Sequence, residues 1–238
     1  MIKPLGETHH VKTINVDKGE VYETDFEPAD EEETANTVTV MGGEDWEFWV
    51  DALHEAGVLA DGFSTVSYNY IGSDLTWPVY WHGTLGKAKE DLDRAAAALR
   101  ERLAPVNGDA RVATLKAVVT QASAAIPVVP LYASLVFKVM KDQGVHETVI
   151  AHIDRLFREK LYGEMRGQFD DVGRIRNDDW ELTEEVQDAV RALWPKVTTE
   201  NVMELSDLEG FRADFLRIFG FGFDGVDYEA DVSPLGIH

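Results

Sequence analysis

The chain alternates between stretches with helical spacing of apolar residues and shorter stretches typical of strands. Residues 41–57 have a helical period of apolar positions. The side chains expected on the shared face of this helix, as core or as a lid over a ligand pocket, are Trp46, Trp49, Val50 and Leu53. Residues 85–103, 130–141, 146–162 and 211–219 also predict helices.

Two segments predict strands. Residues 62–72, GFSTVSYNYIG, are rich in aromatic and β-branched residues and lie between two glycines. A second strand is expected over roughly 111–119. Because these strands alternate with helices, the pattern indicates an α/β protein with a partial parallel sheet.

The N-terminal region predicts a small β-hairpin that turns at Asp17, Lys18 and Gly19. Two sequence boxes predict helix starts, the first from Asp30 to Glu33 and the second from Ser206 to Glu209. We expect one domain over residues 1–238. Its parts are a lead-in and hairpin (1–28), a helical segment (29–61), a catalytic core (62–140) and a helical C-terminal part (141–238) with a final strand at 226–232.

Composition narrows the functional classes. The chain has 238 residues and no cysteine, so disulfides and thiolate catalysis are excluded. No stretch of about 18 apolar residues occurs, and the N-terminus lacks a signal-peptide core, which predicts a cytoplasmic protein. The net charge is −22, from 44 acidic and 22 basic residues. Nucleic acid and anionic membranes are therefore poor partners. No spacing typical of a metal site occurs among the seven histidines.

Tyr80 and Lys89 carry the most informative spacing, with eight residues between them. On one continuous helix they would lie on nearly opposite faces, so the tyrosine is expected to precede the helix. Gly83 and Thr84 supply the expected break, with Thr84 as N-cap. Tyr70 lies near the end of the first predicted strand, and the ends of parallel strands are where open α/β sheets bind ligands. Packing alone remains an alternative for such tyrosines.

Seven segments together resemble one known family. The segments are KPLGETHHVKT, VMGGEDWEFWVDAL, YNYIG, YWHGTLGKAKEDL, VVTQASAAIPVVPLYASLVFKVMK, RIRNDDWEL and GFGFDGVDYEADV. They are similar to the Tyr-x8-Lys trans-2-enoyl-CoA and enoyl-[acyl-carrier-protein] reductases, a divergent branch of the short-chain dehydrogenases. The resemblance implies a Rossmann-like sheet and an oxidoreductase of fatty acid biosynthesis and lipid metabolism.

The implied reaction is hydride transfer from NADH to the β-carbon of an enoyl-CoA or enoyl-ACP thioester. Tyr80 would stabilise and protonate the enolate, Tyr70 would add a donor, and Lys89 would stabilise the tyrosinate. The resemblance also places the cofactor near Lys89 and the run from Thr120 through Gln121 and Ala122. A plain turn from strand to helix is the alternative for that run.

The resemblance covers the C-terminal portion of the family only, since no counterpart of its N-terminal dinucleotide-binding half is seen. We expect a separate half as a partner, or else an inactive acyl-CoA-binding fragment. A GxGxxG at Gly220, Gly222 and Gly225 has a helix-like segment before it and a strand-like one after it, the reverse of a nucleotide fingerprint. We therefore interpret Gly220 as a helix C-cap.

Anionic CoA requires local basic groups. The candidates are Lys87, Lys116, Arg174 and Arg176, although a solvated surface charge is the alternative for each. His82 is a further candidate for substrate contact. A purely structural role for the chain has no positive signal in its favour.

Overall fold

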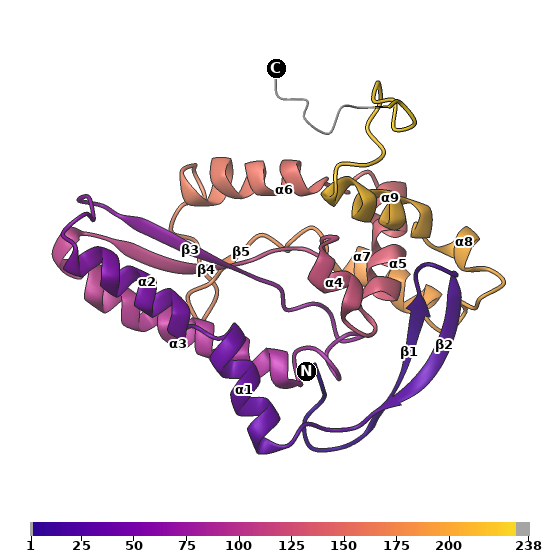
Figure 1. The fold of residues 1–238 in the computed structure, drawn as a ribbon, viewed down its shortest axis with the longest axis horizontal. Helices are drawn as coiled ribbons and strands as arrows, with labels where there is room; N and C mark the ends of the chain where they lie inside the picture. The colour runs from indigo at the N-terminus through magenta and orange to yellow at the C-terminus, as the bar shows by residue number, and fades with distance from the viewer. Residues whose placement is uncertain (1, 232–238) are drawn as a thin grey trace.

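A three-stranded parallel sheet lies at the centre of the protein. The structure, a computed structural model, describes residues 2–231. The strands, in the order in which they pair, are β3 (Ser64–Asn69), β4 (Asp109–Thr114) and β5 (Ile175–Arg176) (Figure 1). The predicted α/β class and the first two strands are confirmed. β5 was missed, because two residues are too short to show alternation.

Alternate side chains of β4 serve the two faces of the sheet. Ala110 and Val112 pack against α3 (Thr84–Leu103), whereas Ala113 packs against Leu156 on the opposite face. Figure 1 shows α2 (Glu44–Glu55) and α3 together along one face and α6 (Val149–Arg155) across the other. α6 continues as a π-helical segment, Leu156–Leu161. Helices on both faces are what a parallel sheet requires.

The helices beside the sheet correct two expectations. Thr84 is the first residue of α3, and the N-cap is Gly83, which no side chain caps. A Cβ on Gly83 would lie 2.6 Å from the carbonyl oxygen of Lys3, so close packing rather than dihedral freedom requires glycine there. In α2, Val50 is buried but Trp49 is 66% exposed. α2 packs against α3, and its Trp46 and Val50 also contact β3 and β4, while Trp49 lies outside this buried stripe, which is narrower than the sequence pattern suggests.

The capping box predicted for α1 (Glu31–Met41) is confirmed. The Asp30 carboxylate accepts from the backbone N–H of Glu33, and the Glu33 carboxylate accepts from the backbone N–H of Asp30. The second box is wrong. The Ser206 hydroxyl donates to the carbonyl of Val202 at 2.7 Å, and Asp207 occupies the N-cap position of α9 (Leu208–Ile218).

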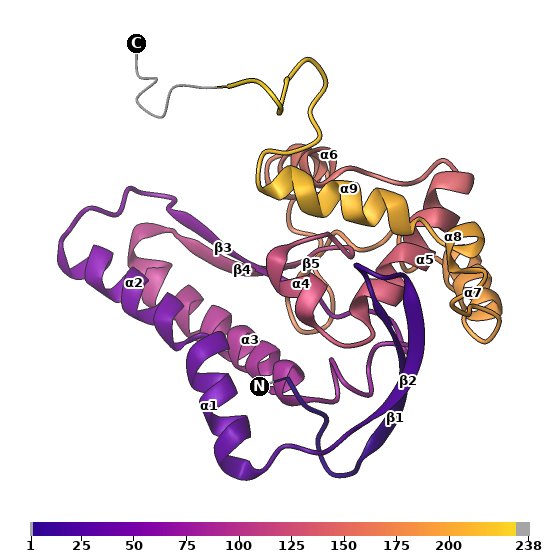
Figure 2. The ribbon, with the colours of Figure 1, turned by 45° about the vertical axis from the view of Figure 1, so that its right-hand side comes forward.

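A second, helical core surrounds α5 (Val129–Asp142), which is buried on nearly all sides. α7 (Glu184–Leu193), α8 (Val202–Leu205) and α9 pack around it. The hairpin of β1 (His9–Asn15) and β2 (Glu20–Phe26) closes this core, and its predicted turn at residues 17–19 is confirmed (Figure 2). Two short helices, Ala104–Val106 and α4 (Gln121–Ala125), complete the described elements.

The C-terminal part differs from expectation in one respect. Gly220 follows α9 with a φ of +87°, as expected of a residue that ends a helix. Residues 226–231 form turns and bends instead of the predicted strand, and residue 232 lies outside the described residues. Within residues 2–231, no helix combines the length and apolar character needed to cross a membrane.

A buried polar cluster attaches α6 to the segment after β5. The Arg155 guanidinium donates to both carboxylate oxygens of Glu147, at 2.8 and 3.0 Å, and to the carbonyl of Asn177 at 2.8 Å. His152 and Asp179 extend the cluster. Because a buried charge is costly without partners, these contacts hold the chain after β5 in one position.

Replacing Arg155 with methionine should therefore lower the free energy of unfolding by about 3–5 kcal/mol, because the Glu147 carboxylate would lose its main charged partner. Urea unfolding followed by tryptophan fluorescence measures the change. The control is Arg158→Met, in the adjoining turn, where the side chain is 76% exposed and pairs with Asp154. That variant should differ from wild type by no more than about 0.5 kcal/mol. Equal stability of the two variants would contradict the assignment.

Candidate active site

The candidate site lies where the three parallel strands end. Tyr70 directly follows β3, Ala117 and Thr120 lie in the segment after β4, and Glu181 lies five residues after β5. Because the carboxyl ends of parallel strands share one edge of a sheet, these residues meet although they are far apart in sequence.

A cavity of about 410 Å³ opens at this edge. Of the predicted site residues, Tyr70, Tyr80, Lys89, Thr120 and Ala122 line it. The other lining residues are mainly apolar: Met41, Tyr68, Asn69, Leu85, Leu115, Lys116, Ala117, Val118, Ser123, Ile126, Val129, Val149 and Ile153. Gln121 is not brought to this cavity and lines a separate one beside Ile14 and Phe211.

Tyr80 is held by the loop that precedes α3. Its backbone N–H donates to Thr76 at 3.0 Å, and its carbonyl accepts from Gly86 at 3.2 Å. The side chain is 5% exposed, and no side chain or backbone group in residues 2–231 is hydrogen-bonded to its hydroxyl. Burial raises the pKa of Tyr80, so the hydroxyl keeps its proton at neutral pH. Tyr80 thus presents a proton donor to the cavity.

Tyr70 packs edge-on against Tyr80, with 5.4 Å between the ring centroids. Its hydroxyl donates to Glu181 Oε1 at 3.2 Å. Burial and, secondarily, the Glu181 carboxyl raise the pKa of Tyr70 well above that of a free tyrosine. Both tyrosines therefore stay protonated.

Lys89 supplies a cation at the same cavity. No ion pair to its amine occurs within the described residues, because the nearby Asp93 is bound by Arg174 at 2.5 Å. Burial lowers the pKa of Lys89, and Asp93 opposes that effect. Tyr80 from the loop and Lys89 from α3 line the same cavity, as the sequence predicts. Their assignment as catalytic residues stays a prediction.

Thr120 has a local structural role in addition to its place at the cavity. Its hydroxyl accepts from the Ser123 N–H at 2.9 Å and caps α4. Between α4 and α5, Val128 adopts a φ of +71°, and the N–H of Val129 donates to the Pro127 carbonyl at 2.8 Å. A β-branched residue in this region is strained. The surrounding contacts therefore force this turn, which sets Ile126 and Val129 against the cavity.

No sequence pattern assigned a role to the residues that lie behind Tyr70. Glu181 is 1% exposed and also accepts from the Tyr132 hydroxyl at 2.8 Å and from the backbone N–H of Ala117. The signal in the sequence was weak: a glutamate between Trp180 and Leu182, soon after a very short strand.

The predicted basic patch for CoA does not form. Lys87 pairs with Glu90, Arg174 with Asp93 and Arg176 with Asp178. Lys116 is 2% exposed, and its amine donates to the carbonyl of Ala117. His82 is exposed and packs at a tilt against Trp77, with 5.7 Å between the ring centroids, and it is not among the residues that line the cavity. No group of three or more side chains suited to a metal ion occurs in the described part of the chain.

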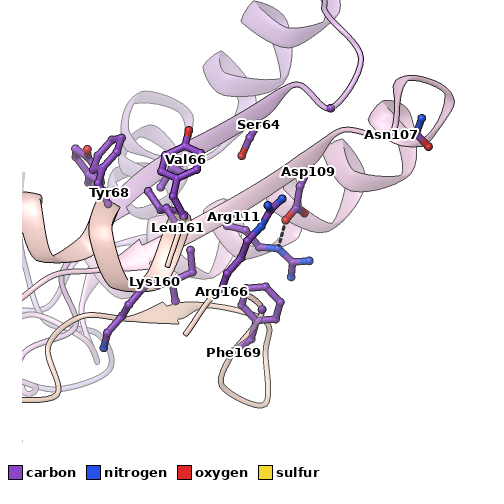
Figure 3. A pocket seen from close by; sticks show the side chains of 15 residues that line it. Ser64, Val66, Tyr68, Asn107, Asp109, Arg111, Lys160, Leu161, Arg166 and Phe169 are labelled. Atoms are coloured by element: carbon purple, nitrogen blue, oxygen red, sulfur yellow. Dashed lines mark hydrogen bonds and ion pairs between the residues drawn. The ribbon is translucent and has the colours of Figure 1, made fainter. Parts of the chain in front are cut away.

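A second cavity of about 410 Å³ lies on the sheet face that carries the π-helical segment Leu156–Leu161 (Figure 3). Ser64, Val66 and Tyr68 line it from β3, and Arg111 lines it from β4 beside Asp109. This cavity spans the sheet face from β3 to β5, where Ile175 also lines it. β3 is an edge strand, which pairs only with β4 among residues 2–231.

The fold and the site together define an α/β protein with a tyrosine-lined ligand cavity at its strand ends. Residues 1–162 match the trans-2-enoyl-CoA reductase catalytic region, and residues 169–232 match the enoyl reductase FAD binding domain. The chain belongs to this enoyl reductase family.

Named relatives and a solved structure support this family membership. The enoyl-[acyl-carrier-protein] reductase [NADH] of Tolumonas auensis is 59% identical over 98% of this chain, and that of Edwardsiella ictaluri is 57% identical over 98%. The chain spans 58% of each relative. The crystal structure of Treponema denticola trans-2-enoyl-CoA reductase in complex with NAD matches 98% of this chain and 58% of that one, with 48% identity and a TM-score of 0.92.

The second family description names FAD, and the described residues of that segment do not fit this group. A dinucleotide diphosphate is held by free cations or by helix N-termini. Residues 169–231 contain five arginines, each already bonded to a carboxylate or carbonyl: Arg174, Arg176, Arg191, Arg212 and Arg217. The segment has one lysine, Lys196, which is exposed and lines none of the three cavities described for this chain. The first turns of α7 and α9 are acidic, and the glycines at 220, 222 and 225 lie in turns.

The loop that carries Tyr80 depends on Gly86. A Cβ there would lie 1.7 Å from the carbonyl oxygen of Trp81, a backbone atom that can move only with the loop. Gly86→Ala should therefore destabilise the protein by about 1–3 kcal/mol, as measured by thermal unfolding. The neighbouring Lys87→Ala, at an exposed position, serves as the control. An unchanged unfolding temperature in Gly86→Ala would show that the loop is not packed as described.

Proposed function

We propose that this chain is the acyl-binding and proton-donating part of an NADH-dependent enoyl-thioester reductase. The observation that carries the proposal is the meeting of Tyr70, Tyr80 and Lys89 at one largely apolar cavity, with the Tyr80 hydroxyl free to donate. Family membership and the names of the relatives support it. The divergent short-chain dehydrogenase architecture implied by the sequence belongs to the same proposal.

The residues suit reduction of a double bond conjugated to a thioester. NADH, when bound, supplies the hydride that is added to the β-carbon. Negative charge then develops on the thioester oxygen, where the Tyr80 hydroxyl donates a hydrogen bond. Lys89 supplies positive charge beside Tyr80 as charge builds up, and the apolar walls accept the acyl chain. The CoA or acyl-carrier portion would remain outside this cavity.

The described residues fit only one end of a nicotinamide dinucleotide. Thr120 and Ala122 offer small side chains at the cavity, where the nicotinamide would lie, with Lys89 near its ribose. A diphosphate cradle of glycines between a strand and a helix is not found within residues 2–231. We therefore assign the rest of the cofactor site to a dinucleotide-binding partner.

The sheet provides a place for that partner. β3 pairs with β4 on one side only, and parallel strands are normally covered on both sides and both faces. Tyr68 of this edge strand is 48% exposed and lines the cavity of Figure 3, which spans the sheet face from β3 to β5. A further parallel strand beside β3 would continue the sheet.

The first test is NADH oxidation with crotonyl-CoA. The chain is assayed alone and after mixing with the segment of the Tolumonas auensis relative that it does not span. Turnover is expected in the mixture, and Tyr80→Phe should lower it by at least about 10²-fold because the proton donor is lost. Tyr22→Phe, on the exposed hairpin strand β2, is the matched control and should retain full activity. A Tyr80→Phe variant as active as wild type would refute the assigned role.

The unpaired edge of β3 also predicts how the chain associates in solution. Unpaired strand edges template association, so the chain alone should form mixed oligomers or aggregates in size-exclusion chromatography with light scattering. Addition of the missing segment should convert it to a single species. A sharp monomer with a cooperative melt in the absence of any partner would count against the proposed edge.

A second candidate function is acyl-CoA binding without turnover, which the absence of a diphosphate cradle from the described residues favours. Calorimetry separates the two. Binding of crotonyl-CoA by the chain, with no NADH oxidation by the chain alone or in the mixture with the missing segment, would select this alternative.

A further inference from the structure

Glu181 is a buried carboxylate that the reaction outlined above does not use. It follows β5, in the segment whose family description names FAD, yet its side chain reaches behind the tyrosine site. Its Oε1 accepts from the hydroxyls of Tyr70 at 3.2 Å and Tyr132 at 2.8 Å, and its Oε2 accepts from the backbone N–H of Ala117. Donors from three separate segments thus converge on one carboxyl group.

The number of hydroxyl protons around Glu181 limits which tyrosine can donate into the cavity. The Tyr132 hydroxyl accepts from Gln187 Nε2 at 2.9 Å, so its own proton goes to Glu181. Tyr70 has a single hydroxyl proton. While Glu181 is ionised, this proton is committed to Oε1, and none is left for an oxygen in the cavity. When Oε1 carries a proton, the carboxyl donates to Tyr70, whose own proton can then turn to the cavity.

The groups around Glu181 are compatible with both the protonated and the ionised form of its carboxyl group. Burial raises the pKa of Glu181, and Asp178, which is paired with Arg176, acts in the same direction. The N–H of Ala117, the Tyr132 hydroxyl and the Lys116 amine oppose that rise. Lys116 is itself buried, and burial lowers its pKa.

We propose that Glu181 is a positioning residue of the tyrosine site, and that its protonation state decides whether the Tyr70 hydroxyl donates into the cavity. The protonated carboxyl releases Tyr70 as a second donor for the thioester oxygen. The ionised carboxylate keeps the Tyr70 proton in its own hydrogen bond, so that Tyr80 donates to the thioester oxygen without Tyr70. This role in catalysis rests on the proposed function, whereas the coupling between Glu181 and Tyr70 does not.

The coupling can be measured without turnover. Infrared difference spectra between wild type and Glu181→Gln isolate the carbonyl stretch of a protonated Glu181, and a pH series gives its midpoint. In Tyr70→Phe, the ionised carboxylate loses a donor, so the midpoint should move to higher pH. A Glu181 that stays ionised at every pH at which the chain is folded would overturn the proposal. A Glu181 titration midpoint that is the same in Tyr70→Phe as in wild type would also overturn the proposal.

The consequence for the reaction is tested in the mixture that supports NADH oxidation. In wild type, kcat should fall as pH rises through the Glu181 midpoint, by no more than the roughly 10²–10³-fold that one oxyanion donor contributes. Glu181→Gln is neutral at all pH values and should abolish this fall. In a Tyr70→Phe background, Glu181→Gln should have no further effect on kcat, because the residue acts through Tyr70.

Tyr132→Phe is the matched control for a merely structural role. It removes the shorter hydrogen bond to the same carboxylate but leaves Glu181 and Tyr70 in place. The variant should keep the pH-dependent fall, shifted to higher pH. Loss of the fall in Tyr132→Phe, or an equal effect of Glu181→Gln with and without Tyr70, would assign Glu181 to structure alone. If wild type shows no turnover, the proposed function fails, and the infrared series still decides the coupling.

Discussion

The burial of one carboxylate constrains the whole site. Glu181 is removed from water, and an ionised or neutral carboxyl in that position needs donors with good geometry. The donors come from the residue after β3, the segment after β4 and the first turn of α5. A shift of any strand end would leave a buried polar group unsatisfied. The parallel strands and the helical core are therefore held in register at the point where the cavity opens.

Most arginines of this acidic protein are used internally. Arg155, Arg174 and Arg176 each bind carboxylates of the same chain, so few cations remain for an anionic ligand. The cavity contains two lysines, Lys89 and Lys116, and burial lowers the pKa of both. Such a cavity suits a thioester and an acyl chain, which are neutral, better than phosphate groups. Under the proposed function, phosphate groups would be recognised outside the described cavity.

Both edges of the sheet are unpaired within residues 2–231. Its order places the short β5 at one edge and the longer β3 at the other, and the second cavity lies beside β3. The match to the Treponema denticola structure, with a TM-score of 0.92 over 98% of this chain, shows that the same arrangement occurs within a longer protein. The geometry at the strand ends depends on contacts inside the matched part, because Tyr70, Tyr80 and Glu181 are all positioned by residues of this chain.

The sequence by itself determined the local elements. Strand-like composition located β3, the capping box located α1, and the spacing of Tyr80 and Lys89 implied a loop followed by a helix. These features depend on neighbouring residues, whose propensities and spacing are visible along the chain. By contrast, the exposure of Trp49 could not be read from helical periodicity, which does not say how many neighbours a helix has.

Only the tertiary structure decided which distant groups meet. The two-residue strand β5 has too little pattern to be recognised, yet its pairing with β4 carries Glu181 to Tyr70, 111 residues away in sequence. The candidate basic patch does not form for the same reason, since Lys87, Arg174 and Arg176 pair with carboxylates that folding places beside them and Lys116 is buried against the Ala117 carbonyl. Propensity acts between neighbours in sequence, whereas hydrogen bonds and ion pairs in a buried site depend on positions that only packing sets.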